Sequence, residues 1–208
     1  MKRLTEIGQK TGTDKATYHA FTEAYDDVFK NYESPRILEI GVYNFSSIQM
    51  YLEYFKNPYI VGMDIDDKQQ FLSDKWKFIR GDQTNVQDLK KCIEGEDLFD
   101  IILDDGGHTM KQQQVSFGFL IDYVKPGGYY ILEDLHTSFN RVYFESDCQF
   151  STYNMLKLVK QNKLPFSNYI DSDQQSHILN KIESIEVFAK NENDLSDSVT
   201  SIIKIKNK

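Results

Sequence analysis

The sequence FDIILDDGGH occupies residues 99–108. Its first half is a short apolar run of the length of a buried strand, and it ends abruptly in two aspartates, two glycines and a histidine. Similar short apolar runs, each also ending in polar residues, occur on both sides of it, at residues 36–41, 59–63 and 129–132, and residues 76–80 alternate as a further strand. Segments of helical period separate these runs, an alternation that is typical of strand-helix units around a parallel sheet.

The remaining elements extend this pattern in both directions. The last two apolar runs, residues 182–188 and 199–205, can pair as antiparallel strands across the loop 191–197. The sequence therefore predicts an α/β protein with a doubly wound, mostly parallel sheet of seven strands and an antiparallel C-terminal strand. We expect residues 1–208 to form a single domain with 1–35 as an N-terminal helical extension. Helices are predicted at 16–32, 46–55, 86–93, 110–124 and 152–160, and a turn at 126–128.

Composition excludes several classes of protein. The chain has 208 residues with 24 Lys and Arg against 32 Asp and Glu, a net charge of −8, which argues against tracking a nucleic-acid backbone. Cys92 and Cys148 are too few for a disulfide framework. No apolar segment follows the basic start, and no run of about 18 apolar residues occurs. We expect a cytoplasmic protein without a membrane span.

Acidic residues stand at the end of each predicted parallel strand: Glu39, Asp64, Asp82, Asp104 with Asp105, and Glu133 with Asp134. In an open parallel sheet, ligands bind beyond the carboxyl ends of the strands, where loops and helix N-termini converge. Acidic residues at so many strand ends indicate a shared ligand site.

Asp64 follows the first glycine turn by about 25 residues, the position of an acid that binds both hydroxyls of a ribose. The alternative is a helix N-cap, a role that suits Asp66 better than Asp64. After Gly41 the turn lacks the further glycines of a dinucleotide fingerprint, and Tyr43 and Phe45 are bulky. These features favour a nucleoside cofactor without phosphates, S-adenosylmethionine, with Glu39 or the Gly41 backbone near its amino-acid end.

Asp105, Glu133 and Asp134 form a second group, three oxygen donors from two strands that should be neighbours. Clustered carboxylates repel one another unless a cation neutralises them, and oxygen-only ligation suits Mg²⁺. The metal would lower the pKa of a substrate hydroxyl, and His108 could take its proton. The structural alternatives are that Asp105 only shapes a turn and that His108 caps the following helix.

Three further features carry two interpretations each. His136 is a substitute candidate for the base or a solvent-facing loop residue. Residues 135–150, rich in aromatic and polar side chains, form either a lid over the acceptor or a helix packed against the sheet. Tyr18, His19 and Tyr25 lie near a ligand or, as their spacing indicates, form a core stripe.

Taken together, the motifs resemble those of class I S-adenosylmethionine-dependent methyltransferases, specifically the Mg²⁺-dependent sugar O-methyltransferases of macrolide pathways, some labelled cephalosporin-hydroxylase-like. The family usually has two glycines at Asn44-Phe45 and often Ser at Gly107. The matching segments are Gly12-Thr13-Asp14-Lys15, Leu38-Glu39-Ile40-Gly41-Val42, Gly62-Met63-Asp64-Ile65, Gly81-Asp82-Gln83, Asp104-Asp105-Gly106-Gly107-His108, Lys125-Pro126-Gly127-Gly128 and Glu133-Asp134-Leu135.

The resemblance implies a role for each matching residue. Asp105, Glu133 and Asp134 would bind the metal, and His108 would be the general base, with Asp105 counted as catalytic too. The cofactor would contact Asp64 at its ribose, Asp82 and Gln83 at its adenine, and Glu39 with Gly41 at its methionine, and Asp104 is a further cofactor-binding candidate.

We therefore expect transfer of a methyl group from S-adenosylmethionine to a hydroxyl of a sugar or glycosylated metabolite. The partner is a small-molecule or glycan-precursor substrate, and a homo-oligomer is left open. Three alternatives remain: a metal-dependent methyltransferase of a catechol or other small phenol, a nicotinamide-dependent oxidoreductase, disfavoured by the missing glycines, and a non-catalytic binding protein that retains the fold.

Overall fold

The computed structural model describes residues 2–68 and 74–207. Within them, seven strands form one sheet in the order β3-β2-β1-β4-β5-β7-β6. The first five strands are parallel, β7 runs antiparallel to β5, and β6 runs antiparallel to β7. This arrangement confirms the predicted fold class. The strands are β1 (Arg36–Ile40), β2 (Tyr59–Asp64), β3 (Trp76–Arg80), β4 (Phe99–Asp104), β5 (Val124–Leu132), β6 (Ile182–Ala189) and β7 (Val199–Ile205).

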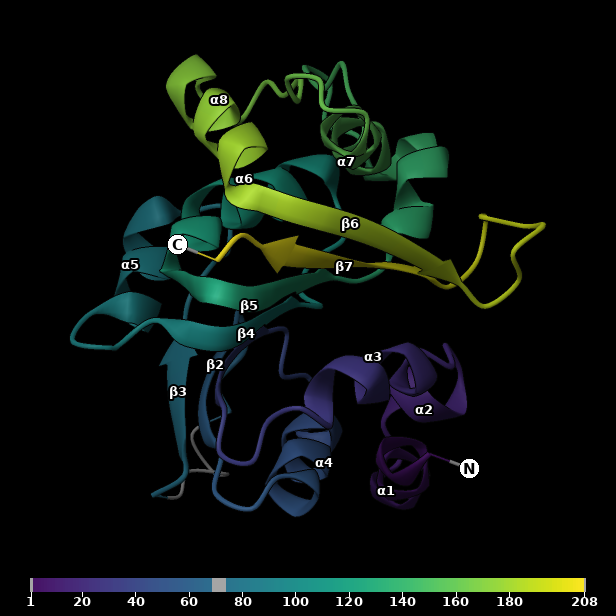
Figure 1. Ribbon diagram of the computed structural model, residues 1–208. Helices are drawn as coiled ribbons and strands as arrows, with labels where there is room; N and C mark the ends of the chain where they lie inside the picture. Colours follow the sequence, from purple (N-terminus) through teal and green to yellow (C-terminus); the bar gives the residue numbers. More distant parts are fainter. Residues whose placement is uncertain (1, 69–73, 208) are drawn as a thin grey trace.

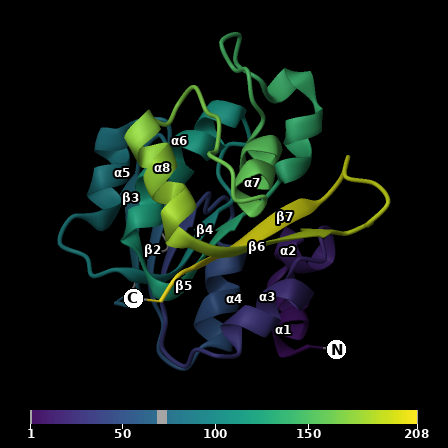
Figure 2. The same cartoon turned by 45° about the horizontal axis from the view of Figure 1, so that its top comes forward.

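Helices cover both faces of the sheet (Figure 1). α1, α2, α3 and α4 lie on one face and α5, α6, α7 and α8 on the other, a separation that the turned view keeps (Figure 2). A hydrophobic core fills each side: Phe29, Tyr51 and Trp76 belong to the first, Phe117 and Met155 to the second. The helices are α1 (Arg3–Thr11), α2 (Asp14–Thr17), α3 (Thr22–Phe29), α4 (Ser46–Tyr54), α5 (Val86–Ile93), α6 (Met110–Leu120), α7 (Thr152–Lys160) and α8 (Ser172–Lys181).

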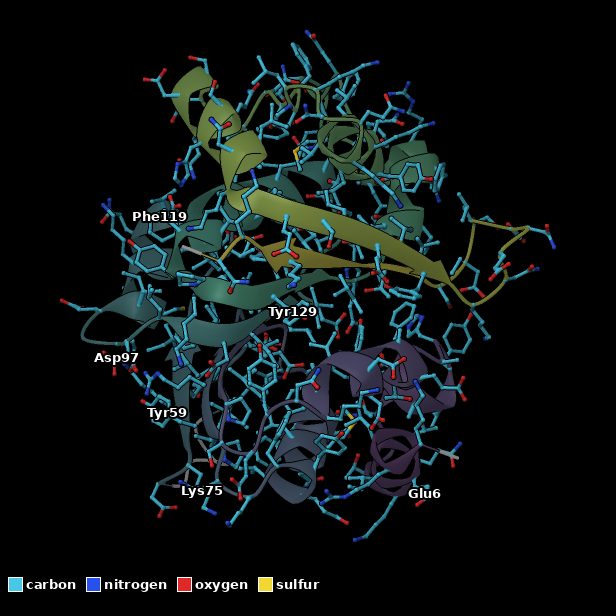
Figure 3. The ribbon with its side chains drawn as sticks, viewed as in Figure 1. Glu6, Tyr59, Lys75, Asp97, Phe119 and Tyr129 are labelled. Atoms are coloured by element: carbon cyan, nitrogen blue, oxygen red, sulfur yellow. The ribbon has the colours of Figure 1, made fainter. Side chains whose placement is uncertain are left out.

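Charged side chains such as Glu6 and Asp97 project outward from this framework (Figure 3). In the part of the chain that the structure describes, no helix is both long enough and apolar enough to cross a membrane.

The predicted helix 16–32 is wrong, because the structure divides it into α2 and α3. Ala20 between them has φ 61°, a left-handed conformation that a right-handed helix cannot contain. The Phe21 N–H instead donates to the Lys15 carbonyl, 2.8 Å away. The side-chain spacing is helical on both sides of the break, so periodicity alone could not reveal it.

Other differences are smaller. The predicted helix 110–124 ends at Leu120 and continues as a 3₁₀ turn, η2 (Ile121–Tyr123). The predicted turn 126–128 lies inside β5, where the register with β4 shifts between Phe99 and Ile101 and Gly127 has φ 76°. Two helices, α1 and α8, have no counterpart among the individually predicted helices; both sequences are mostly polar, although Leu4 and Ile7 give α1 a buried apolar face.

The strand order locates the ligand crevice. From β1 the chain builds outward to β2 and β3, and then returns to β4 on the opposite side of β1. β1 and β4 are therefore neighbours whose following connections diverge, which leaves a crevice at their carboxyl ends.

Candidate functional site

A cleft of about 340 Å³ lies beyond the carboxyl ends of β1, β2 and β4. Its volume is within the range of small-molecule sites. Three of the predicted site residues, Glu39, Asp104 and Glu133, are not in its lining and are buried beneath it. Seven predicted site residues do line it: Gly41, Asp64, Asp82, Gln83, Asp105, His108 and Asp134.

Gly41 brings two walls of the cleft into contact. It has φ 85°, and a Cβ atom built on it would lie 1.9 Å from the carbonyl oxygen of Asp105. The Asp105 N–H donates to the Ile40 carbonyl over 2.9 Å. The turn after β1 and the turn after β4 therefore touch through their backbones, and only glycine leaves room for that approach.

Asp64 fastens the same turn from the other side. Its Oδ2 accepts the N–H groups of Val42 at 3.0 Å and Tyr43 at 2.8 Å, and its Oδ1 accepts the Asp66 N–H at 2.9 Å. The carboxylate also faces the cleft. Each carboxylate oxygen has two lone-pair directions, so these bonds leave acceptor capacity for a ligand hydroxyl.

The bulky residues of this turn have different environments. Tyr43 is 75% exposed at the rim of the cleft. Phe45 is buried, with its ring centroid 5.4 Å from that of Trp76. Phe45 therefore fills the core rather than the cleft, although both residues have positive φ.

Gln83 links the cleft to the buried carboxyl group of Asp104. The Gln83 Oε1 accepts the Gly107 N–H at 2.6 Å, and its Nε2 donates to Asp104 Oδ1 at 3.1 Å. Asp104 also accepts from Ser116 and Tyr130, and burial raises the pKa of its carboxyl to about 6. Asp104 thus supports the loop after β4 from beneath, without facing the cleft.

Asp105, His108 and Asp134 converge at the opposite end of the cleft. One ligand atom from each lies within 4.8 Å of the others. The His108 Nε2 is 3.2 Å from Asp134 Oδ2. Among the described residues, the buried Asp134 Oδ1 has no hydrogen-bond partner; it lies 3.6 Å from His136 Nδ1 and 4.0 Å from His19 Nδ1.

Asp134 owes this position to its backbone. It has φ 54°, and the 3₁₀ turn η3 (Leu135–Phe139) begins directly after it. Aspartate tolerates this left-handed conformation better than most residues do, and such strained positions cluster at functional sites.

Glu133 lies behind this group, fully enclosed. Its Oε1 accepts the Tyr25 hydroxyl at 2.9 Å, and the Lys15 ammonium is 3.3 Å from the same carboxylate. Burial, and then the charge of Asp105, raise the pKa of Glu133 well above its usual value.

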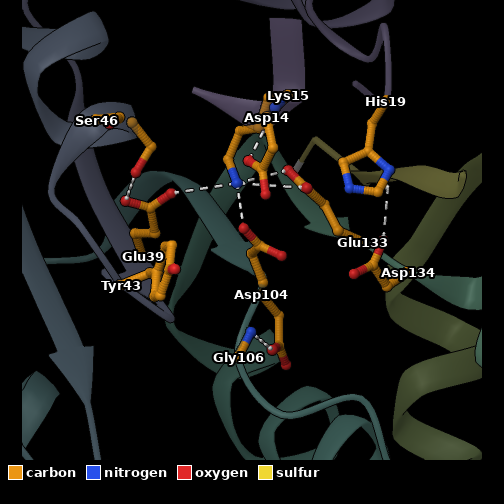
Figure 4. A network of polar contacts seen from close by, with 12 residues as sticks. Asp14, Lys15, His19, Glu39, Tyr43, Ser46, Asp104, Gly106, Glu133 and Asp134 are labelled. Carbon is orange, nitrogen blue, oxygen red and sulfur yellow. Dashed lines mark hydrogen bonds and ion pairs between the residues drawn. The ribbon is translucent and has the colours of Figure 1, made fainter. Parts of the chain in front are cut away.

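Lys15 is the centre of the buried charges (Figure 4). Its side chain is 1% exposed, and its Nζ contacts Asp105 Oδ2 and Glu133 and lies 3.8 Å from Glu39 Oε1. Burial opposes the charge on Lys15, but Asp105, Glu133 and Glu39 outweigh it and hold its pKa well above the usual value.

Glu39, in contrast, accepts its hydrogen bonds from hydroxyl groups. Its carboxylate accepts the Ser47 hydroxyl at 2.8 Å and the Tyr51 hydroxyl at 3.1 Å, and its side chain is completely buried. Burial raises the pKa of Glu39 to about 7, with Lys15 opposing that shift.

Lys15 is not among the site residues predicted from the sequence. The available signal was its place in the Gly12-Thr13-Asp14-Lys15 segment of the family resemblance. Tyr25 and His19 had been assigned to a core stripe or, alternatively, to a ligand. Tyr25 is buried and bonded to Glu133, whereas the His19 Nδ1 is 2.9 Å from Ser198 Oγ of the loop before β7.

Residues 135–150 are short turns rather than a helix. η3 buries Leu135 and Thr137 against the protein, whereas Phe139 is half exposed. A second 3₁₀ turn, η4, covers Arg141–Tyr143. Burial lowers the pKa of the His136 imidazole. The segment packs against the protein at its start, and a lid formed by the remainder stays a prediction.

Known proteins resemble this chain in sequence. Mycinamicin VI 2''-O-methyltransferase of Micromonospora griseorubida is 34% identical over 146 residues, which are 65% of this chain and 37% of that enzyme. Demethylmacrocin O-methyltransferase of Streptomyces fradiae has the same identity over the same coverage. The chain therefore matches little more than a third of the length of these curated relatives. No protein-family model matches it.

Solved structures agree with the sequence matches. The structure of the MycE methyltransferase from the mycinamycin biosynthetic pathway, in complex with Mg, SAH and mycinamycin VI, superposes with a TM-score of 0.81 at 26% identity. The match covers 99% of this chain and 56% of MycE. The fold is that of the class I methyltransferases.

More particularly, the chain is homologous to one region of the sugar O-methyltransferases that act in macrolide and related polyketide pathways. The resemblance inferred from the motifs is confirmed by these homologues.

Proposed function

We propose that this protein is an S-adenosylmethionine-dependent, Mg²⁺-assisted O-methyltransferase that acts on a hydroxyl of a glycosylated small molecule. One observation carries the proposal: Asp64 at one end, and Asp105, His108 and Asp134 at the other, line a single cleft at the crevice between β1 and β4. This arrangement would put a nucleoside cofactor next to an acidic cation site. Homology to enzymes with this activity supports the same assignment.

The cofactor roles follow the walls of the cleft. Asp64 would bind a ribose hydroxyl with its remaining acceptor capacity, while Asp82 and Gln83 lie where the adenine end would be. The Gly41 turn adjoins Asp105, so the methionine end would lie next to the acidic group. Glu39, buried under Ser47 and Tyr51, would act on that end only through the protein around it.

The residues fit a hard divalent cation. Asp105 and Asp134 offer carboxylate oxygens on the cleft wall, Glu133 stands behind them, and the buried Asp134 Oδ1 has no hydrogen-bond partner among the described residues. Hard cations prefer such oxygen donors. A bound Mg²⁺ would supply Lewis-acid stabilisation of a hydroxyl that loses its proton.

His108 is placed to take that proton. It lines the cleft, and its Nε2 is 3.2 Å from Asp134 Oδ2. A carboxylate beside an imidazole orients the ring for proton transfer. Asp134 would then both bind the cation and orient the base. His136, with a pKa lowered by burial, is the second candidate for the base.

The acceptor class rests on the relatives, whose names specify mycinamicin VI and a rhamnosyl tetracenomycin. We therefore propose a glycosylated small molecule rather than a nucleic acid, in keeping with the net charge of −8. We also propose that residues 1–208 act as one catalytic unit with 1–35 as its helical extension. A cytoplasmic location is a proposal that rests on two cysteines, both unpaired.

Two variants test the proposal at opposite ends of the cleft. Asp64→Asn should weaken S-adenosylhomocysteine binding measured by calorimetry while Mg²⁺ still binds. Asp105→Ala should lose Mg²⁺ binding and Mg²⁺-dependent methyl transfer to a macrolide glycoside while S-adenosylhomocysteine still binds. Full transfer in the presence of a chelator would remove the metal from the proposal.

Ligand screening separates the alternatives. A thermal melt that shows no stabilisation by any adenosyl ligand would favour a non-catalytic protein. Stabilisation by NADH but not by S-adenosylhomocysteine would favour an oxidoreductase. Turnover of catechol, with no turnover of any glycoside, would change the acceptor class.

A further inference from the structure

We propose that Lys15 is a positioning residue of the cation site: its ammonium occupies the space between Asp105 and Glu133 when no divalent ion is bound, and moves onto Glu39 when one binds. The inference rests on the proposed function, since it assigns a role toward the same divalent ion. It predicts that removal of the Lys15 ammonium raises metal affinity and that removal of the Glu39 carboxylate lowers it.

Position is the first argument. The Lys15 Nζ contacts both Asp105 and Glu133, which project from the ends of two neighbouring strands, β4 and β5. These are two of the three carboxylates predicted to bind the metal. The ammonium therefore lies between the side chains that a divalent ion would have to join.

Charge is the second argument. Asp105, Glu133 and Asp134 would repel one another without a cation, and burial makes that repulsion stronger than it would be in water. One ammonium between two of them keeps the cluster compact before a metal arrives. A divalent ion brings twice the charge, and so it can replace the ammonium.

Glu39 is the third argument. Its Oε1 is 3.8 Å from the Lys15 Nζ, and Glu39 does not line the cleft. Ser47 and Tyr51 hold this carboxylate in place with two hydrogen bonds. A displaced ammonium would therefore reach a fixed counter-charge through a small movement and would remain compensated within the protein.

The alternative is that Lys15 has a purely structural role, in which its ion pairs hold α2 against the sheet. If that role is the only one, removal of the Lys15 side chain destabilises the protein and leaves metal affinity unchanged or weaker. Competition for the site predicts a gain in affinity. The two roles therefore differ in the sign of one measured quantity.

The experiment titrates Mg²⁺ alone into the full chain by calorimetry and repeats the thermal melt with and without Mg²⁺. Lys15→Met should bind Mg²⁺ at least about tenfold more tightly, because one like charge has left the ligands. Mg²⁺ should also raise its melting temperature more than it raises that of the wild type. Lys10→Met, which removes a lysine paired with Glu53 on the surface, is the matched control and should change neither quantity.

Glu39→Gln should act in the opposite direction. It keeps Lys15 but removes the carboxylate that receives it, so Mg²⁺ should bind about tenfold more weakly. In the double variant with Lys15→Met, the Glu39→Gln substitution should have no further effect, because no ammonium remains to be received. This interdependence would not arise if the two residues only stabilised the fold.

Lys15→Met that binds Mg²⁺ as the wild type does, or more weakly, would overturn the inference while leaving the proposed function in place. Absence of Mg²⁺ binding in every variant would instead remove the metal from the proposed function, and the inference with it. If Lys15→Met does not fold, Glu39→Gln decides alone: unchanged or tighter Mg²⁺ binding refutes the proposal.

Discussion

Replacing Gly41 by alanine tests whether the turns after β1 and β4 are packed as the structure places them. Alanine at φ 85° suffers the strain of a left-handed conformation, about 1–2 kcal/mol. Its Cβ would also lie 1.9 Å from the Asp105 carbonyl oxygen and 2.8 Å from the Gly106 Cα. These are backbone atoms that cannot rotate aside, and such overpacking typically costs about 1–3 kcal/mol. We expect Gly41→Ala to lower the free energy of unfolding by about 2–5 kcal/mol.

Two other glycines provide matched controls. Gly12 has φ 78° and Gly95 has φ 73°, and an added Cβ would meet no atom within 4 Å at either position. Alanine at these sites incurs the backbone strain, about 1–2 kcal/mol, without the collision. The unfolded-state effect of Gly→Ala is common to all three variants. The difference between Gly41→Ala and the controls therefore isolates the contact between the two turns.

Urea unfolding measures this difference directly. Trp76 is the only tryptophan and is almost fully buried, so its fluorescence reports unfolding. In conditions where Gly41→Ala stays folded, calorimetry should also show weaker binding of S-adenosylhomocysteine, because the Asp105 turn must move. Equal destabilisation by Gly41→Ala and Gly12→Ala would refute the reasoning, since it would mean that the two turns do not touch.

Three further predictions concern other residues of the site. His108→Gln should slow single-turnover methyl transfer by about 10²–10⁴-fold with S-adenosylhomocysteine affinity unchanged; an unchanged rate would direct the search to His136. Asp104 has a pKa raised from 3.8 to about 6 in the folded protein, so it binds a proton more readily when folded, and its contribution to stability is lost as pH rises from about 4 to 6. Asp104→Asn should remove up to about 3 kcal/mol of that pH dependence in urea unfolding, and an identical pH dependence in both proteins would contradict the assignment. Tyr25→Phe removes the hydroxyl that bonds Glu133 and Thr200 and should cost about 1–3 kcal/mol by the same assay, whereas a cost within error would show that these bonds contribute nothing.

Much of the fold followed from the sequence by itself. Short apolar runs, each ending in polar residues, identified four of the five parallel strands, because a strand buried on both faces needs a continuous apolar sequence. Alternation identified the fifth, β3, which lies at the edge of the sheet. The rule that ligands bind at the carboxyl ends of such strands then selected Asp64, Asp105, His108 and Asp134, all of which line the cleft.

Tertiary structure decided which of the acidic residues face the cleft and which lie beneath it. Glu39, Asp104 and Glu133 also stand at strand ends, but their side chains point into the protein and are satisfied there by Ser47, Ser116 and Tyr25. Alternate residues of a strand point to opposite sides, and only the packed neighbours determine which side is closed.

The position of Lys15 among the carboxylates depended on tertiary structure even more strongly. It is 90 residues from Asp105 in the chain, and no local pattern marks a lysine that will be enclosed among carboxylates. The left-handed residue Ala20, which lies between α2 and α3, is equally invisible to helical periodicity. The sequence specified the sheet and its acidic edge, because those depend on local apolar patterning. The Lys15 ammonium reaches that edge only through long-range contacts with its carboxylates, and such contacts exist only once the chain has folded.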